Sequence, residues 1–332
     1  MKRTLILFQK AVRAVGCANG QGGKHLGCES AVNILRNSPY LKNVKVPIEW
    51  SAVVEEVATG RQWNALQGVT QTNRRLARET RKVIESGEDL VVFGGDHSCA
   101  IGTWSGIAAA LRPRGELGLI WVDAHMDAHT PESTPSGNIH GMPVSHLLGF
   151  GEKNLVQIED QMPKIFPHNF CMVGMRSYEE GEQELLEKLG VRIFYMHEVE
   201  RRGITDVMQE AVYIATRNSC GFGMSIDIDG FDVSFAPAVG TPAEGGIDAE
   251  QFMKALLTVD LSKLVATEIV EFLPKFDDQN KTSERLVASL VESIYATKFF
   301  QQNSAAHIKQ QVQISDKAAE VIESRQKQQQ TV

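Results

Sequence analysis

The stretch LGLIWVDAHMD, Leu117–Asp127, sets the fold class of this chain because it joins an apolar run to a group of polar residues. The apolar part offers hydrophobic side chains to both faces of an extended chain, which is typical of a strand buried inside a parallel sheet. The polar part contains Asp123, His125 and Asp127. Buried carboxylates without a partner are costly, so we expect this cluster to hold a ligand.

Short apolar runs alternate with segments of helical period along most of the chain. The expected strands lie within residues 1–16 and at residues 90–94, 117–123, 169–174, 191–196, 221–228 and 264–272. The expected helices lie at residues 73–85, 98–111, 180–189, 205–216, 248–259 and 282–300. This alternation predicts an α/β fold in which helices cover both faces of a central, mostly parallel, doubly wound sheet, a three-layer αβα arrangement.

The chain has 332 residues, of which 42% are hydrophobic, so it is long enough to bury a large core. No shift in composition and no internal repeat divides it, and we expect one α/β domain over residues 1–300. Residues 301–332 are polar and Gln-rich. We expect them to form either a disordered tail or an arm that lies on a neighbouring subunit.

Charge and composition argue against several classes of function. The net charge is −7, and the basic residues of segment 74–82 are interspersed as the solvated face of a helix, so no nucleic-acid partner is expected. The apolar runs are much shorter than the roughly 20 residues of a transmembrane helix, so no membrane partner is expected either. The five cysteines are scattered and odd in number, which favours reduced thiols in a cytoplasmic protein.

Four polar motifs each stand at the end of an expected strand. They are GGDHS (residues 94–98), DAHMD (123–127), SIDIDG (225–230) and EIVEF (268–272). Ligands of open parallel sheets bind in the crevice beyond the carboxyl ends of the strands. We therefore expect these motifs, although far apart in sequence, to meet at one site.

The residue types in these motifs suit divalent metal ions. Asp123, His125 and Asp127 occupy alternate positions of an extended chain, which turns their oxygen and nitrogen donors to one side. The other candidate ligands are His97, Asp227 and Asp229. Four carboxylates and two imidazoles exceed the needs of one ion, so we expect two ions with shared carboxylates, and this oxygen-rich set favours Mn²⁺ over thiolate-preferring zinc. Two such ions can hold a water between them and lower its pKa.

Each motif also has a plain structural interpretation. A single D-x-D is often a turn or a helix cap, and a lone histidine after two glycines is as often a structural residue. The stretch DIDGFD, residues 227–232, lacks the glycine and glutamate spacing of an EF-hand calcium loop. One ligand site explains four such motifs at four strand ends better than four separate structural roles do.

The motifs together resemble the signature blocks of the ureohydrolase family. The matching blocks are GGDHS, DAHMDAHTPESTPSGNIHG (residues 123–141), SIDIDGFDVSFAPAVGTP (225–242) and EIVEF. SGNIHG, residues 136–141, is similar to arginases more than to agmatinases. Family-like blocks extend from about Phe93 to Phe300, and the first fifty residues match only weakly. The resemblance implies an enzyme with two manganese ions that hydrolyses a guanidinium group to urea and an amine.

The resemblance also implies which residues hold each ion. One manganese ion would be bound by His97, Asp123, Asp127 and Asp227. The other would be bound by Asp123, His125, Asp227 and Asp229. Asp123 and Asp227 would therefore bridge the two ions.

Other positions match residues that act on the substrate in this family. Asp127 would orient the attacking hydroxide, and Glu271 would pair with the substrate guanidinium. His140 would carry a proton to the leaving amine, a role that suits the near-neutral pKa of imidazole. Thr241 would be a further contact on the guanidinium side.

Loop residues would recognise the other end of the substrate. Ser136 and Asn138 stand as in family members that bind an α-carboxylate. His129 stands where an asparagine is common, and Glu179 where an aspartate usually contacts the α-amino group. Histidine still donates to a carboxylate and glutamate still accepts from an ammonium, so both contacts stay available. The alternative is that both residues belong to outer loops and never touch the substrate.

Three functions stay open from the sequence. The first is hydrolysis of L-arginine to L-ornithine and urea, by a homo-oligomer that the resemblance implies to be a trimer or hexamer. The second is hydrolysis of agmatine or of a guanidino acid such as 4-guanidinobutyrate, which lack the α-carboxylate and the α-amine respectively. The third is a non-catalytic binding protein of the same fold. The complete ligand set disfavours this third function, and it also disfavours a single-zinc deacetylase of similar fold.

Overall fold

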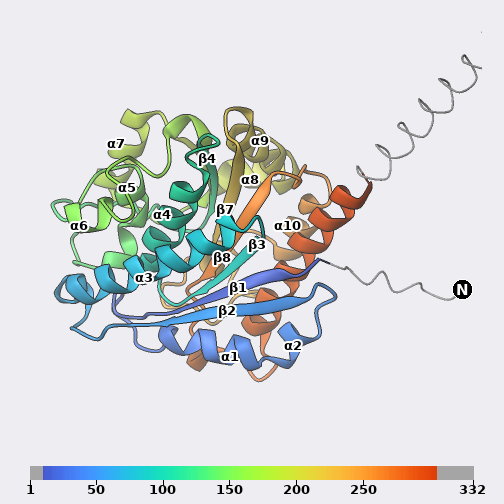
Figure 1. Cartoon of the computed structure of the whole chain (residues 1–332), viewed down its shortest axis with the longest axis horizontal. Helices are drawn as coiled ribbons and strands as arrows, with labels where there is room; N and C mark the ends of the chain where they lie inside the picture. Colours follow the sequence, from blue (N-terminus) through green and yellow to red (C-terminus); the bar gives the residue numbers. More distant parts are fainter. Residues whose placement is uncertain (1–9, 305–332) are drawn as a thin grey trace, which may run out of the picture.

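The computed structural model describes residues 10–304, and its centre is one sheet of eight strands (Figure 1). The strands are β1 (Val12–Ala18), β2 (Ile48–Glu55), β3 (Asp89–Gly94), β4 (Leu117–Val122), β5 (Phe170–Met175), β6 (Arg192–Tyr195), β7 (Gly221–Asp227) and β8 (Leu264–Val270). Their order across the sheet is β2-β1-β3-β8-β7-β4-β5-β6. All neighbouring strands in this sheet pair in parallel, so their carboxyl ends share one edge.

Helices cover both faces of the sheet. They are α1 (Ala31–Asn37), α2 (Pro39–Lys42), α3 (Leu66–Glu85), α4 (Ala100–Leu111), α5 (Pro143–Leu147), α6 (Lys153–Val156), α7 (Glu180–Leu189), α8 (Met196–Arg202), α9 (Ile204–Arg217), α10 (Ala249–Leu256) and a last helix at residues 282–304. One buried core packs α1, α8, α9, α10 and the last helix on the sheet. A second core packs α3, α4, α5 and α7 on the opposite face. The predicted three-layer αβα fold is therefore confirmed.

Most of the expected elements appear close to their expected positions. The six strands expected between residues 90 and 272 correspond to β3 through β8, and α7 has the expected bounds. Helix α3 begins at Leu66, seven residues before the expected start at residue 73. Strand β2 was not expected, because it lies at the edge of the sheet with many side chains partly exposed, and its apolar residues Ile48, Trp50, Ala52 and Val54 stand at alternate positions instead of in one long run.

The two ends of the chain test the sequence predictions only in part. Strand β1 begins at Val12, within the range expected for the first strand, whereas residues 1–9 lie outside the described residues. Residues 301–304 continue the last helix. The rest of the predicted polar tail, residues 305–332, lies outside the described residues, so the division into one domain and a tail stays a prediction.

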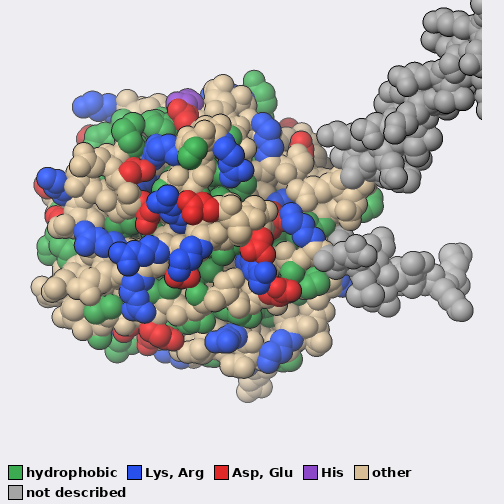
Figure 2. Space-filling view, in the orientation of Figure 1, with side chains coloured by type: hydrophobic (Ala, Val, Ile, Leu, Met, Phe, Trp, Pro, Cys, Tyr) green, Lys and Arg blue, Asp and Glu red, His purple; other side chains and the backbone are tan. Residues whose placement is uncertain are grey.

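The basic segment 74–82 forms the exposed side of α3, as the sequence predicts. Arg74, Arg75 and Arg78 are exposed. Arg81 forms ion pairs with Glu85 at 2.7 Å and with Glu159 at 2.9 Å. Figure 2 shows Lys and Arg side chains on this face of the molecule with Asp and Glu side chains among them. These charged side chains keep the outer side of α3 in contact with water, and the opposite charges partly neutralise one another.

Two further features of the described residues bear on the class of protein. Among residues 10–304, no helix is both long enough and apolar enough to cross a membrane. All five cysteines lie in this range and are free thiols. Cys17, Cys28, Cys99 and Cys171 are buried, and Cys220 is exposed.

Strand β4, which leads into the DAHMD motif, packs against α9 through Gly118. A Cβ atom on Gly118 would lie 1.8 Å from the carbonyl oxygen of Ala215 in α9. Only a residue without a side chain allows this approach, so Gly118 sets the distance between the helix layer and the strand that presents the site.

We expect Gly118→Ala to destabilise the protein by about 1–3 kcal/mol, because the new methyl group must push α9 away from β4. Thermal or urea unfolding measures the change. Gly181→Ala is the control, since its Cβ would lie 3.4 Å from the nearest atom, an ordinary contact. Equal stability of the two variants would contradict this account of the packing.

Candidate active site

The four polar motifs follow or close four neighbouring strands in the middle of the sheet. Strands β3, β8, β7 and β4 lie side by side in that order (Figure 1). GGDHS, EIVEF, SIDIDG and DAHMD stand at their carboxyl ends. His97 and Glu271, 174 residues apart in the chain, are direct neighbours, and the His97 N–H donates to Glu271 Oε1 at 2.8 Å. The expected convergence of the motifs is confirmed.

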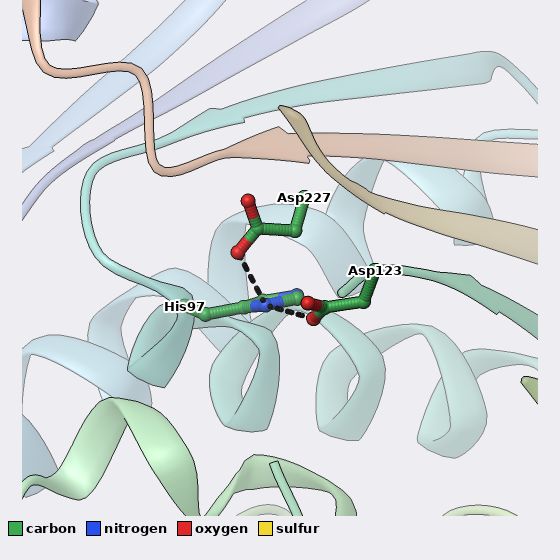
Figure 3. A group of neighbouring side chains, drawn as sticks. All are labelled: His97, Asp123 and Asp227. Atoms are coloured by element: carbon green, nitrogen blue, oxygen red, sulfur yellow. Dashed lines mark ion pairs between the residues drawn. The ribbon is translucent and has the colours of Figure 1, made fainter. Parts of the chain in front are cut away.

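The first side-chain cluster surrounds the ring of His97, which begins the short helix η3 (His97–Cys99) after β3. His97 Nδ1 lies 3.2 Å from Asp123 Oδ2, 3.0 Å from Asp127 Oδ2 and 3.3 Å from Asp227 Oδ2. Figure 3 shows His97, Asp123 and Asp227 pointing toward one another from three separate segments. All four side chains are buried.

The second cluster consists of Asp123, His125 and Asp229. His125 Nδ1 lies 3.1 Å from Asp229 Oδ2 and 3.6 Å from Asp123 Oδ1. Asp229 lies in the short helix η6 (Ile228–Gly230) after β7, and Thr241 donates a hydrogen bond to its Oδ2 at 3.1 Å. Asp123 belongs to both clusters, which places the two groups next to each other.

Burial and mutual repulsion perturb the carboxylates of these clusters. Burial and the charge of Asp123 raise the pKa of Asp127 to about 6. Burial and the neighbouring charges of Asp229 and Asp123 hold the pKa of Asp227 well above its usual range. Burial alone would raise the pKa of Asp123, but His125 and His97 outweigh it and hold this pKa below its usual range. The site therefore gathers more negative charge than its two imidazoles balance.

The residues of the first cluster fit a divalent metal ion. His97 Nδ1 is buried and has no hydrogen-bond partner among the described residues. The other ring nitrogen, Nε2, lies 3.0 Å from Ser225 Oγ, and Ser225 donates to Glu268 Oε2 at 2.7 Å. Because the Ser225 hydrogen goes to Glu268, Nε2 is the donor to Ser225, and Nδ1 is the ring nitrogen that faces the carboxylates. Burial lowers the pKa of His97, but these carboxylates outweigh it and raise this pKa well above its usual value, so a cation bound here would replace the proton on Nδ1. An imidazole lone pair among carboxylate oxygens is a ligand set for a divalent cation.

The buried Glu271 and the partly buried His140 form a pair beside the clusters. His140 lies in the short helix η4 (Ile139–Gly141), and its Nδ1 is 2.9 Å from Glu271 Oε1. Burial lowers the pKa of His140, but Glu271 more than reverses this and raises it to about 9. Burial raises the pKa of Glu271, but His140 outweighs it and leaves it below its usual range. At neutral pH the pair is therefore an imidazolium and a carboxylate.

Two of these residues have an unusual backbone conformation. Asp127 has a φ of 49° and Glu271 a φ of 61°. This left-handed region costs a residue other than glycine roughly 1–2 kcal/mol. The strain is retained because backbone hydrogen bonds hold both residues: Glu271 N–H donates to Gly95 O at 2.8 Å, and Val144 N–H donates to Asp127 O at 2.9 Å. Strained residues of this kind concentrate at functional sites.

A cavity of about 290 Å³ opens onto the clusters. The predicted site residues on its wall are His125, Asp127, His129, Ser136, Asn138, His140, Glu179, Asp227 and Thr241. The remaining ones, His97, Asp123, Asp229 and Glu271, are at most 3% exposed. The structure thus brings every predicted site residue either to the wall of one cavity or into the buried clusters beside it.

A third group, at the N-terminus of α7, lines the same cavity. His129 Nε2 lies 2.9 Å from Glu179 Oε2 and 3.4 Å from Glu182 Oε2. The backbone N–H groups of Ala128 and Glu179 already donate to the two oxygens of Glu182. These bonds at the N-terminus of α7 satisfy both oxygens of Glu182 without a cation, although burial outweighs them and raises the pKa of Glu182 to about 8. Glu179 and Glu182 therefore cap α7 and also hold the His129 ring. The Glu179 carboxylate lines the cavity and is already hydrogen-bonded to His129.

Sequence reasoning missed several residues that shape the site. They are Glu182, Ser225, Glu268 and Gln62. The Glu179-x-x-Glu182 spacing, which resembles a capping box, was the available signal for Glu182. Ser225 stands two residues before Asp227 in β7, and Glu268 stands three residues before Glu271 in β8. Only the pairing of these two strands brings Ser225 and Glu268 together. Gln62 lies outside every motif and gave no signal.

The fold and the site define an α/β protein with a carboxylate-rich centre for divalent cations. Comparison with known proteins agrees: the sequence matches the arginase family over residues 17–296. The arginase of Bacillus caldovelox is 40% identical over 254 residues, which cover 76% of this chain and 83% of that protein. The chain therefore belongs to the arginase family.

Solved structures of arginases also resemble this chain in sequence and fold. The arginase of Bacillus subtilis is 35% identical with a TM-score of 0.78, over 86% of this chain and 98% of that chain. The arginase of Entamoeba histolytica, solved in complex with L-ornithine, is 29% identical with a TM-score of 0.77 over the same shares. The expected family and fold are both confirmed.

We expect Asp123→Ala to weaken metal binding at both clusters by more than about a hundredfold, because both lose a direct ligand. Metal content after reconstitution and desalting, measured by plasma mass spectrometry, checks this. Asp232→Ala is the control, since Asp232 lies nearby but belongs to neither cluster. A variant that keeps the wild-type metal content would contradict the shared role of Asp123.

Proposed function

We propose that this protein is an arginase, which hydrolyses the guanidinium group of L-arginine to L-ornithine and urea. As a member of the arginase family it is a hydrolase that acts on a guanidino C–N bond. One observation carries the proposal. Two imidazole–carboxylate clusters share Asp123 beside the cavity, and the Glu271–His140 pair is hydrogen-bonded to the backbone of the first cluster.

We propose that the clusters hold two Mn²⁺ ions per chain. The ligands of one ion would be His97, Asp123, Asp127 and Asp227, and those of the other Asp123, His125, Asp227 and Asp229. When bound, the ions would supply Lewis acidity that lowers the pKa of a nearby water. Asp127 lines the cavity, so its carboxylate is available to orient that water by accepting a hydrogen bond.

Glu271 is proposed to bind the substrate guanidinium. Its Oε1 already accepts from the His97 N–H and from His140. Its Oε2 accepts only a weak hydrogen bond from the Cys28 thiol at 3.6 Å, so this oxygen is the more available one for a guanidinium N–H. The charge of Glu271, favoured by its lowered pKa, strengthens such a bond.

His140 is proposed to protonate the leaving amine. Its Nδ1 donates to Glu271, and this pairing keeps the ring protonated at neutral pH. The hydrogen on Nε2 is then the one that can pass to the departing nitrogen, and His140 is on the cavity wall.

Four loop residues are proposed to recognise the amino-acid end of L-arginine. Ser136 and Asn138 would donate to the α-carboxylate, with His129 as a further donor, and Glu179 would accept from the α-ammonium. All four line the cavity. Thr241, also on the wall, is proposed as a contact on the guanidinium side. The E. histolytica relative was solved with L-ornithine, the amine product proposed here.

One observation favours a second candidate substrate. The Glu179 carboxylate is already hydrogen-bonded to His129 at 2.9 Å, so an α-ammonium must share or displace that partner. A guanidino acid such as 4-guanidinobutyrate, which has the carboxylate but no α-amine, avoids this competition. Agmatine keeps an amine and so does not avoid this competition, and it has no carboxylate for Ser136 and Asn138 to bind.

The location and assembly of the protein are also proposals. The free state of all five cysteines supports a reducing compartment, and we propose the cytoplasm. The family resemblance is the basis for proposing a homo-oligomer, either a trimer or a hexamer.

The manganese-loaded protein should release urea from L-arginine with a kcat/KM at least about a hundredfold above that for agmatine or 4-guanidinobutyrate. A site that hydrogen-bonds a polar group of its substrate discriminates strongly against analogues that lack the group. Preference for 4-guanidinobutyrate would move the assignment to the second candidate. Absence of urea from all three compounds with metal bound would reject the enzymatic function.

Replacing Glu271 by Gln should lower kcat/KM for L-arginine by about a hundredfold, since a neutral amide cannot pair with the guanidinium charge. Metal content should stay at the wild-type level, because Glu271 is not a proposed ligand. Glu250→Gln, on the exposed side of α10, is the matched control. Full activity of the Glu271 variant would remove this residue from the mechanism.

A further inference from the structure

Gln62, which the proposed mechanism does not use, lies against the rim of the cavity in a strained conformation. It begins the short helix η2 (Gln62–Ala65) with a φ of 54°. Its N–H donates to Gln21 O at 2.7 Å. The neighbouring Arg61 holds the same loop: its guanidinium donates to the carbonyls of Gly20, Gly23 and His25 at 2.8, 2.9 and 2.9 Å. This backbone is therefore fixed independently of the Gln62 side chain.

The Gln62 side chain reaches two residues of the cavity wall. Its Nε2 donates to Asn138 Oδ1 at 2.8 Å and, more weakly, to Ser136 O at 3.4 Å. Ser136 and Asn138 line the cavity, whereas Gln62 is not part of its wall. Gln62 therefore stands behind these two residues, and we expect its effect on a ligand to pass through them.

These contacts decide which polar groups the rim offers to a ligand. The Asn138 amide oxygen is occupied by Gln62, so the amide Nδ2 hydrogens are the group left to face a ligand. Ser136 Oγ accepts from the Asn138 N–H at 3.2 Å, which leaves the hydroxyl hydrogen free to donate. Both residues are therefore set as donors, and paired donors recognise an anionic acceptor such as a carboxylate.

We propose that Gln62 is a positioning residue that fixes the Asn138 amide as a donor and thereby selects guanidino substrates that carry a carboxylate. The inference deepens the proposed function, because it names a residue that controls recognition of one end of the substrate. Without the Gln62 donor, the Asn138 amide can turn and present its oxygen to the ligand. An oxygen facing a carboxylate is repulsive, so binding of carboxylate ligands falls while ligands without a carboxylate are unaffected.

Two side-chain variants isolate this effect. Gln62→Met keeps a similar length but has no donor, and Gln62→Glu replaces the donor with an acceptor. Neither changes the backbone bond to Gln21 or the contacts of Arg61. Gln67→Met, at an exposed position of α3, is the matched control for the change of residue type.

The readout compares two ligands that differ only in the carboxylate. Calorimetry on the metal-loaded full chain gives dissociation constants for L-ornithine and for 1,4-diaminobutane, and steady-state kinetics gives kcat and KM for L-arginine. We expect Gln62→Met to weaken L-ornithine binding and raise the KM by about tenfold. The kcat should stay within about twofold, and 1,4-diaminobutane binding should not change. Gln62→Glu should show the larger loss, and Gln67→Met none.

Three results would overturn the inference. They are an equal loss for both ligands in the Gln62 variants, no loss for either, and a wild-type protein that does not prefer L-ornithine to 1,4-diaminobutane. Failure of the proposed function is a separate result, namely no urea from any guanidino compound by the metal-loaded wild type. The binding measurements need no turnover, so they test Gln62 even in that case.

Discussion

The repulsion among four buried carboxylates at one edge of the sheet is the constraint on which the site depends. Asp123, Asp127, Asp227 and Asp229 are each at most 7% exposed. Some of their oxygens are satisfied by the backbone: Asp227 Oδ1 accepts from the Asp229 N–H at 2.8 Å, and Asp123 Oδ1 from the His125 N–H at 2.7 Å. Other oxygens point toward the two imidazoles. So much buried negative charge is stable only with cations nearby, which explains why the clusters suit divalent ions.

A second layer of buried polar groups holds this geometry. The ring of His97 stacks on Trp121, with centroids 4.1 Å apart, and Trp121 Nε1 donates to Asp123 Oδ2 at 2.9 Å. Behind them, Glu268 receives hydrogen bonds from Ser225 and Trp104, and Ser225 binds His97. His97 and Asp123, two of the proposed metal ligands, are thus held in position by these contacts. Such outer contacts commonly tune the affinity of the metal site.

The outer part of the cavity is built differently, from loops. Ser136, Asn138 and His129 belong to the segment between β4 and α5, and Glu179 caps α7. Their hydrogen bonds are to one another, to Gln62 and to nearby residues such as Ser133 and Ser145, rather than to the sheet. In the proposed mechanism, the groups that act on the guanidinium are therefore held at strand ends, while the groups proposed to recognise the rest of the substrate stand on loops, where side chains can differ without disturbing the centre.

The sequence by itself determined the α/β class, six of the eight strands from β3 onward, and the residues of the clusters, because these features are local. An apolar run marks a buried strand, and alternate Asp and His positions mark donors on one side. The prediction missed β2, an edge strand in which apolar residues alternate with exposed ones. It also did not reveal the bonds of Glu268 to Ser225 and of Gln62 to Asn138. Tertiary structure alone decided these bonds, because hydrogen bonds between distant segments depend on strand order and loop path, which leave no periodic trace in the chain.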